Sequence, residues 1–560
     1  MPSLLQSKPI FQPGTAFHFI AIGLLWGLAA LLVDYRGDFP LNDDWSYGIA
    51  VQRLVEEGTY APTAWTSMSL ISQVGWGSLF SYLFGFSFEV LRLSTLLLSL
   101  LTLFGIYLTV RQLDGSGGMA LLVTLLIAFN PIYFALSYTF MTDVPFLGFM
   151  VVALLFSLRY LKSESVSHLI VATVFATLAV LCRQVGLFLP IALGLTLFYR
   201  NGFKARSLLA AALPGLVCLG ALLGYQFWLE QTARTPELYG KQTQDLVAII
   251  LRPKQWPMAF AKSILIGALY LGLFLLPLFG LLLASGAATP PVRWFKRWLI
   301  RAVVPVGALI GAVLLYTGEL MPLEGNILSE VGIGPLTLHD VYALNLPNAG
   351  ALPSEFWVVV TVISGAGAVI FMVYAFTVTR FAVINFVQQR RSDPHYLRFF
   401  LLSGIAVYVA PVLFLGFYDR YLLTPLLLGS LLLVLDQPCI PRLKLALPSA
   451  ALLLLAAYIS VAGTHDYLSW NRARWQALRY MDENGNVPYN QIDGGFEYNG
   501  LRLYTDGSLR AKKTQKWWTK EDDRYVVTFG RVADYGVVQS FEYDRWLPFS
   551  TGKIYVLKIR

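Results

Sequence analysis

The stretch DFPLNDDWSY at positions 38–47 directly follows the first long apolar segment of the chain. It places acidic side chains just outside the bilayer that such a segment enters. From Tyr47 onward, apolar residues recur at the spacing of one helix face, which predicts an amphipathic helix lying flat on the membrane. Asn42 is the residue type expected to cap the start of this helix. Two neighbouring carboxylates, Asp43 and Asp44, therefore stand at a helix start.

The two carboxylates can be interpreted in two ways. Neighbouring side chains at a helix start diverge by roughly 100°, so they cannot face one ligand in the same way, and one is expected to support the other. The simpler alternative is that both only complement the helix dipole, for a few tenths of a kcal/mol. The rest of the chain favours a site, because its few other membrane-level charges gather on the same side.

The composition excludes an ordinary soluble protein. Of the 560 residues, 56% are hydrophobic, 14% are aromatic and only 13% are charged, whereas about a quarter are charged in typical soluble proteins. The net charge of +9 does not indicate nucleic acid, because the basic residues lie mostly in short loops between apolar segments and near the C-terminal end. The three cysteines, Cys182, Cys218 and Cys439, have neither disulfide nor metal-ligand spacing.

The sequence predicts a mainly α-helical, polytopic membrane protein with about thirteen spans of the length that crosses a bilayer. The first span lacks a cleavage site and is expected to stay as an uncleaved anchor. The spans are predicted at 15–33, 91–110, 118–135, 144–160, 168–182, 185–199, 207–228, 259–284, 299–316, 353–379, 398–417, 421–436 and 444–462. A further apolar segment at 68–86 carries serines and a glutamine, and a re-entrant or surface-lying piece explains that polarity better.

Basic residues concentrate in one set of alternating loops, which the positive-inside rule assigns to the cytoplasm. The N-terminus is therefore predicted inside, and the chain from Gly463 outside. Residues 1–462 form the predicted membrane module, whose outer loops lie at 34–90, 230–258 and 317–352.

Three further charged positions lie at the outer surface. Asp143 precedes Pro145, which suits the first turn of the next span. Arg183, followed by Gln184, separates two apolar runs too close for any loop, so this cation must snorkel or bind something. Asp419 and Arg420 occupy a short turn, where they could simply pair, although the flanking tyrosines would suit a polar pocket.

The two longer outer loops differ in character. Loop 230–258 mixes basic and aromatic residues, which suits lipid phosphates or anionic sugars and equally suits resting on headgroups. Loop 317–352 has no Lys or Arg, is rich in Gly and Pro, and is a candidate lid. Its His339 and Asp340 could bind a metal or orient a base, and a satisfied surface pair is the simpler alternative.

Residues 463–560 are predicted to form a small α/β or α+β domain. A helix is expected at 466–483, broken at Asn484-Gly485. Strands are expected at 492–498, 501–504, 525–529, 536–543 and 553–559, with turns at 499–500 and 506–507. The run Asp493-Gly494-Gly495 is expected to be a tight turn. No nucleotide- or metal-binding motif is present, so the cofactors of soluble enzymes are not indicated.

Several of these features occur together in one known family. They are the inside N-terminus, about thirteen spans, the Asp43-Asp44 pair, Thr-Asp-x-Pro at 142–145, Tyr-Asp-Arg-Tyr-Leu-Leu-x-Pro at 418–425 and the outer C-terminal domain. In this combination the chain resembles the GT-C glycosyltransferases. Within that superfamily it is similar to the bacterial branch related to protein O-mannosyltransferases and to the aminoarabinose transferases of lipid A.

The resemblance implies a hexosyl- or pentosyltransferase of the bacterial cytoplasmic (inner) membrane. Such enzymes move a sugar from a polyprenyl-phosphate carrier to an acceptor at the outer face, where the acceptor could be a glycan, a lipid or a protein. By this likeness Asp44, with Asp43 beside it, corresponds to the family's first-loop acid and Asp143 to its second. The family often has Asp-Glu where this chain has Asp43-Asp44. It also commonly has Lys-Pro-Pro in a region that here, at 67–75, lacks lysine.

The donor phosphate must then be held otherwise, by Arg183, Arg92 or a basic residue of loop 230–258. A phosphate leaving group needs cations more than a proton donor, whereas the acceptor hydroxyl needs one base. Asp44 is the predicted base or orienting group, with Asp43 and Asp143 shaping the site or sharing a divalent metal. The remaining substrate-binding candidates are Arg183, Tyr47, Gln184, His339, Asp340, Asp419 and Arg420.

Two other functional classes remain open at this stage. A carrier or flippase of lipid-linked sugars would place ionisable groups near the bilayer midplane and often shows two related halves. A sensor or scaffold would not need so many outer acids. Expected partners are the polyprenyl-phosphate sugar, the acceptor and membrane lipids, and no nucleic acid.

Overall fold

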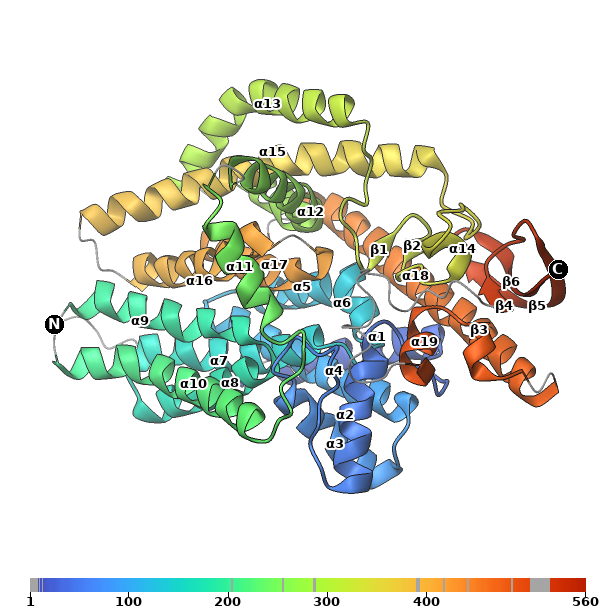
Figure 1. Ribbon diagram of the computed structural model, residues 1–560. Helices are drawn as coiled ribbons and strands as arrows, with labels where there is room; N and C mark the ends of the chain where they lie inside the picture. Colours follow the sequence, from blue (N-terminus) through green and yellow to red (C-terminus); the bar gives the residue numbers. More distant parts are fainter. Residues whose placement is uncertain are drawn as a thin grey trace.

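The computed structural model describes residues 9, 11–12, 14–202, 205–253, 256–285, 289–388, 393–415, 418–440, 443–484, 487–503 and 524–560. Long helices run along the molecule, and a small sheet lies at the end that carries the C-terminus (Figure 1). The N-terminal half contains α1 (Thr15–Val33), α2 (Asp44–Glu57), α3 (Ile71–Phe84), α4 (Phe88–Gln112), α5 (Gly117–Ala128), α6 (Pro131–Leu136), α7 (Asp143–Ser163), α8 (Val166–Cys182), η1 (Gln184–Leu187), α9 (Phe188–Asn201), α10 (Ala205–Gln231) and α11 (Lys241–Ile250).

The described part of the C-terminal half combines the remaining helices with six strands, of which β5 and β6 are the longest. These elements are α12 (Trp256–Ala284), α13 (Pro290–Thr317), β1 (Leu328–Ser329), β2 (Gly332–Ile333), α14 (His339–Tyr342), α15 (Ser354–Val387), α16 (Asp393–Leu415), η3 (Asp419–Leu422), α17 (Leu423–Asp436), α18 (Leu443–Asn484), η4 (Tyr489–Gln491), β3 (Ile492–Asp493), α19 (Phe496–Leu503), β4 (Tyr525–Thr528), β5 (Tyr535–Trp546) and β6 (Phe549–Ile559). The mainly helical class predicted from the sequence is confirmed.

Within the described ranges, nine helices are long and apolar enough to cross a membrane: α1, α4, α7, α10, α12, α13, α15, α16 and α18. The other four predicted spans coincide with α5, α8, α9 and α17, which are shorter, at 12 to 17 residues. The thirteen predicted spans therefore all fall on helices, and nine of them reach spanning length. The doubtful segment 68–86 contains only α3, whose 14 residues reach roughly 21 Å, too short for a bilayer.

Helix α2 buries the face that the sequence predicted, with Tyr47, Ala50 and Val51 at its centre. The predicted cap, however, is wrong. The helix begins at Asp44 with Asp43 in the N-cap position, and no side chain caps it. Asn42 instead adopts a left-handed conformation, with φ of 56°, because its N–H donates to Glu497 Oε1 at 3.0 Å.

Arg92 holds the first outer loop against the bundle. Its guanidinium is 1% exposed and donates to four backbone carbonyls. They belong to Tyr35 (2.6 Å), Gly37 (3.1 Å), Phe39 (2.9 Å) and Tyr138 (2.9 Å). Because a buried cation is costly unless its N–H groups are satisfied, these bonds fix the path of the loop. Because these bonds occupy the N–H groups of the guanidinium, Arg92 does not fit the role of phosphate holder that was considered for it.

The C-terminal region contains a four-stranded sheet in the order β3-β4-β6-β5, with β3 parallel to β4 and the other pairs antiparallel. The three later strands were predicted correctly. The strand predictions at 492–498 and 501–504 were largely wrong, because only β3 is extended and α19 follows. The predicted turn at 499–500 lies inside α19, and the turn at 506–507 lies outside the described residues. Helix α18 runs unbroken across the predicted boundary at 463.

The turn before α19 is organised by Asp493, as its sequence predicted. Asp493 Oδ1 accepts the Gly495 N–H at 2.9 Å and the Asn499 side-chain amide at 2.7 Å. Gly495 has φ of 87°, a conformation that glycine adopts without strain. These bonds start a helix where alternating residues had suggested a strand.

Glu497 of α19 joins the outer segments. Its Oε1 accepts from Asn42, and its Oε2 accepts from Thr337 Oγ1 at 2.8 Å and from Arg474 Nη1 at 2.7 Å. The side chains of Glu497 and Arg474 are both fully buried. One carboxylate therefore links the first outer loop, loop 317–352, α18 and α19.

Replacing Glu497 with Gln should lower thermal stability strongly. The variant keeps the shape of the side chain but leaves the Arg474 charge buried without a counter-charge, which costs about 3–5 kcal/mol. Thermal unfolding in detergent, followed by intrinsic fluorescence, measures the effect.

The matched control is Glu542→Gln on β5, whose exposed pair with Lys553 spans 3.0 Å. Exposed pairs contribute about 0–1 kcal/mol, so this variant should unfold near the wild-type temperature. Equal unfolding temperatures for the two variants would contradict the role given to Glu497.

Candidate active site

Four charged side chains from separate segments gather at one place, which we call the Asp–Arg cluster. They are Asp43 before α2, Asp143 at the start of α7, Arg183 after α8 and Arg420 in η3. All four act electrostatically on the hydroxyl of Tyr47, which is 4% exposed and whose pKa burial raises well above its usual value. The structure thus brings together acids and cations that lie far apart in the chain.

Asp43 is the half-buried carboxylate of the cluster. Its Oδ1 accepts the indole N–H of Trp65 at 2.9 Å, and its Oδ2 lies 4.0 Å from Arg420 Nη1. Burial raises the pKa of Asp43, and the Arg420 charge opposes that rise. A carboxylate oriented in this way and still partly exposed is placed to accept a proton from a bound hydroxyl.

Asp143 and Arg183 form a buried ion pair, in which Arg183 Nη1 donates to Asp143 Oδ1. The guanidinium carbon of Arg183 also lies 5.3 Å from the centre of the Tyr421 ring. Among the described residues, Asp143 Oδ2 and Arg183 Nε have no hydrogen-bond partner. Because buried polar atoms are normally satisfied, each of these atoms is open to a water or a ligand.

Arg420 completes the cluster. Its guanidinium carbon lies 5.4 Å from the centre of the Tyr418 ring and 5.9 Å from that of Tyr421, so Arg183 and Arg420 share one aromatic neighbour. Arg420 Nε also has no hydrogen-bond partner in the described part of the chain. Two guanidinium groups with unused donors are well suited to an oxyanion such as a phosphate.

Asp44 has a different environment from Asp43. It is 2% exposed, and its two oxygens accept the backbone N–H groups of Leu41 (3.3 Å) and Phe140 (2.9 Å). Burial raises its pKa to about 8. Asp44 therefore ties the first outer loop to the segment just before Asp143, and this placement does not fit the role of base predicted for it. Of the two neighbouring acids, Asp43 is the one that faces the cluster.

The side chain of Gln184, next to Arg183, is hydrogen-bonded to the backbone. Its Nε2 donates to the Ser67 carbonyl at 3.1 Å, and the Leu70 N–H donates to the Cys182 carbonyl at 3.1 Å. These bonds hold the lysine-free segment before α3 against the short connection that carries Arg183. Gln184 thus positions its neighbour.

His339 and Asp340 both bond to the C-terminal region of the chain. His339 Nδ1 lies 2.8 Å from Asp493 Oδ2. Asp340 is fully buried and accepts the N–H groups of Phe529 and Gly530, each at 3.0 Å. Both residues therefore dock loop 317–352 onto the C-terminal sheet, which does not fit the substrate contacts or the surface pair considered for them.

The metal ligands considered from the sequence are not assembled. Asp43 and Asp143 lie in the cluster, whereas His339 and Asp340 bond to the C-terminal region. In the ranges that the structure describes, no group of three or more His, Cys, Asp or Glu side chains could hold a metal ion.

Asp419 positions Arg420 without pairing with its guanidinium. The Asp419 side chain is fully buried and accepts the N–H groups of Ile327 (2.9 Å), Leu328 (2.7 Å) and Arg420 (2.7 Å). It therefore anchors the start of the β1–β2 hairpin beside the cluster. The simple Asp419–Arg420 pair considered from the sequence is not formed, because the Arg420 side chain is directed to Asp43.

Two contributors were missed from the sequence. Trp65 orients Asp43, and Glu497 holds Asn42 beside it. A tryptophan in a polar connecting segment was the available signal for Trp65. Glu497 lay in a predicted strand, and nothing local indicated a partner in the first outer loop.

Residues 76–228, which run from α3 to α10 and include Asp143 and Arg183, match the family model of dolichyl-phosphate-mannose-protein mannosyltransferases. No curated protein matches the chain significantly in sequence.

Solved structures offer weaker likenesses. The Saccharomyces cerevisiae protein O-mannosyltransferase Pmt1-Pmt2 complex bound to the sugar donor is 19% identical, with a TM-score of 0.34, over 42% of this chain and 36% of that one. ArnT from Cupriavidus metallidurans bound to undecaprenyl phosphate is 14% identical, with a TM-score of 0.34, over 80% and 78%. The Archaeoglobus fulgidus oligosaccharyltransferase complex with Zn and sulfate is 16% identical, with a TM-score of 0.41, over 87% and 57%.

At TM-scores below 0.5 these likenesses support no inference about this chain, which spans about a third of the length of the yeast mannosyltransferase. The family match covers less than a third of the chain, but it includes one acid and one cation of the cluster. The likeness to protein O-mannosyltransferases that the sequence predicted is therefore confirmed over residues 76–228.

Proposed function

We propose that the chain is a membrane glycosyltransferase that moves a sugar from a polyprenyl-phosphate carrier to an acceptor hydroxyl. The observation that carries the proposal is the meeting of Asp43, Asp143, Arg183 and Arg420 around one tyrosine. The family match over 76–228 supports glycosyl transfer as the reaction class. The reaction takes place at the outer face of a bacterial inner membrane, with residues 1–462 as the membrane module and 463–560 as an outer domain.

Arg183 and Arg420 hold the donor phosphate. In the reaction the bond between sugar C1 and the phosphate oxygen breaks, and the electron pair stays on the phosphate. Two guanidinium groups offset the charge that develops there, and their unused Nε atoms supply the donors. Asp143 positions Arg183 through the buried ion pair.

Asp43 is the base, or the group that orients the acceptor. The acceptor oxygen bonds to C1 while its proton passes to the Asp43 carboxylate, which later returns it to water. The Trp65 N–H fixes the direction of this carboxylate, and burial keeps the pKa of Asp43 above its usual value. A base with a raised pKa takes the proton more readily than an ordinary carboxylate.

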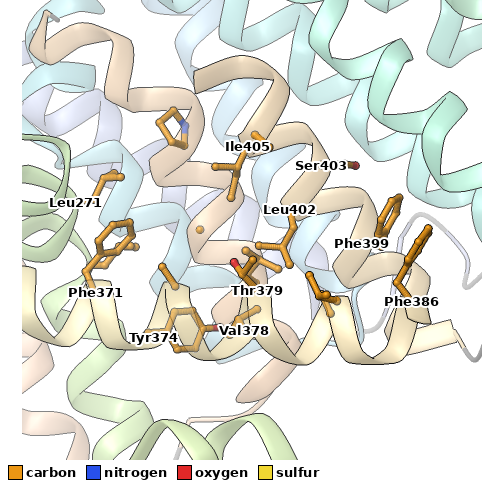
Figure 2. A pocket seen from close by; sticks show the side chains of 18 residues that line it. Leu271, Phe371, Tyr374, Val378, Thr379, Phe386, Phe399, Leu402, Ser403 and Ile405 are labelled. Carbon is orange, nitrogen blue, oxygen red and sulfur yellow. The ribbon is translucent and has the colours of Figure 1, made fainter. Parts of the chain in front are cut away.

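The lipid chain of the carrier occupies an apolar cavity of about 410 Å³ between α12, α15, α16 and α17. Figure 2 shows Phe371, Tyr374 and Val378 of α15 below Leu402 and Ile405 of α16. Helix α17 contributes Pro425 and Gly429, and this helix follows directly after η3, which carries Arg420. An isoprenoid chain that descends from the cluster along α17 reaches the cavity.

Asp43→Asn should reduce the transfer rate by about 10²–10⁴-fold, because an amide cannot accept the acceptor proton. Purified protein is incubated with polyprenyl-phosphate sugars and an envelope extract, and transferred sugar is followed by mass spectrometry. A carrier would instead move the intact donor across vesicles without releasing its sugar.

The matched variant is Asp44→Asn, which replaces the neighbouring acid in the same way. It should cost about 1–3 kcal/mol of stability, because one backbone N–H loses its acceptor, while most of the transfer activity stays. If Asp44→Asn abolished transfer in folded protein and Asp43→Asn did not, the two assignments would be reversed.

Arg420→Met should move the acid limb of the pH–rate profile to higher pH. Transfer requires ionised Asp43, so the rate falls as the pH drops through the pKa of that carboxyl. The positive charge of Arg420 lowers this pKa, so removing that charge raises the pKa further. Single-turnover rates, normalised to their plateau, give the position of the limb.

Arg420→Lys keeps a positive charge and should leave the limb near its wild-type position. An acid limb that stays in place in Arg420→Met would mean that the titrating base is not Asp43.

A further inference from the structure

A second apolar cavity, which we call the outer crevice, lies where α15, α18 and the β1–β2 hairpin meet. Its volume is about 170 Å³. Its walls include Leu328, Trp357, Val360, Ala456, Ile459 and Leu547. Helix α12 separates it from the larger cavity, because Leu273 and Pro277 face the outer crevice whereas Leu271 and Leu275 face the other.

The outer crevice adjoins the Asp–Arg cluster. Leu328, which lines it, donates its backbone N–H to Asp419 Oδ2 at 2.7 Å, and Arg420 follows directly in the chain. The same hairpin residue therefore borders the crevice and is bonded to the turn that carries a cluster cation.

The C-terminal region covers one side of the crevice. Leu547 lines it, and its N–H is held by Asp466 Oδ2 at 2.9 Å. The hairpin packs so closely on this residue that a Cβ at Gly332 would lie 3.1 Å from Leu547 Cδ2. Apolar surface adjoins the crevice on α15 and α18, because Val362, next to the lining residue Ile363, is 67% exposed and Leu454, next to the lining residue Leu453, is 72% exposed. In a membrane, such surface faces lipid.

Of the described residues that line the crevice, Asn130 and Trp357 carry polar side-chain atoms, and each makes a hydrogen bond within the protein. Asn130 Oδ1 accepts the Ile132 N–H at 3.1 Å, and Trp357 Nε1 donates to the Glu330 carbonyl at 3.2 Å. The volume is close to that of an engineered cavity of about 150 Å³ that binds benzene, which is enough for a short length of hydrocarbon. The crevice therefore fits an alkyl chain better than a peptide or a sugar.

We propose that the outer crevice binds an acyl chain of the acceptor, so the acceptor is a membrane lipid that carries a hydroxyl in its headgroup. This inference rests on the proposed function. The two cavities on opposite faces of α12 then hold the two hydrocarbon chains of the reaction, with the carrier chain in the larger cavity and the acceptor chain in the outer crevice. The reacting headgroups meet at the cluster between them.

Ala456→Phe tests the proposal, because it places a ring in the crevice. The control is Ala451→Phe on the same helix, at an exposed position outside the crevice. Each variant and the wild type are reconstituted with phosphatidylglycerol that carries a photoactivatable group near the end of one acyl chain. Cross-linked positions are mapped by mass spectrometry, with and without added polyprenyl phosphate.

Wild type and Ala451→Phe should label crevice residues, and Ala456→Phe should lose this labelling while the exposed positions of α18 stay labelled. Label displaced by polyprenyl phosphate, or spread equally over exposed and crevice positions, would overturn the proposal, because the crevice would then belong to the carrier or to bulk lipid.

The second readout is transfer to acceptors in an envelope extract. Ala456→Phe should slow the appearance of sugar on extractable lipid by roughly tenfold or more, with unchanged donor affinity. Sugar found only on protein or water-soluble glycan, or equal rates for the two variants, would overturn the proposal. A wild-type protein that released no sugar from any donor would instead refute the proposed function, and the labelling would still report on the crevice.

Discussion

The geometry of the Asp–Arg cluster depends on how buried polar groups in the connecting loops find hydrogen-bond partners. Asp44 takes the N–H groups of Leu41 and Phe140, and Arg92 takes four carbonyls from the same two loops. A buried charge without such partners costs several kcal/mol, so the loops have little freedom to adopt another path. Asp43 and Asp143, one and three residues from the bonded positions Asp44 and Phe140, are brought together as a consequence.

The two cations of the cluster are also held by contacts with buried side chains. Arg183 pairs with Asp143, Arg420 is placed by the buried Asp419, and both guanidinium groups lie against Tyr421. The charges of the two acids and the two guanidinium groups neutralise one another in the resting protein, which lowers the free-energy cost of burying them. Their unused donors remain available for an oxyanion, and the partly exposed Asp43 remains available for a proton. A group-transfer site requires loops that are held in place and charged side chains whose hydrogen-bonding groups are still available to the substrate.

Most of the helices and site residues could be predicted from the sequence, but the roles of the individual residues could not. Periodicity located the helices at the predicted spans and α2, and the pattern of charges singled out Asp143, Arg183 and Arg420, because these signals are local. The roles of Asp43 and Asp44 depend on which carboxylate reaches Phe140, a contact across 96 positions that no local pattern encodes. The same holds for His339 and Asp340, whose partners lie in the C-terminal region. The strand predictions near 492–504 failed because Asp493 starts a helix that alternation alone does not reveal.

The central claim is that the Asp–Arg cluster is the binding site for a lipid-linked phosphate. A cryo-EM structure of the full chain in a lipid nanodisc with polyprenyl phosphate tests it most directly. We expect the phosphate between Arg183 and Arg420, within hydrogen-bond distance of both guanidinium groups, with the lipid chain leading into the cavity between α15 and α16. A phosphate bound elsewhere on the protein, with Asp43 and Asp143 apart, would contradict the account.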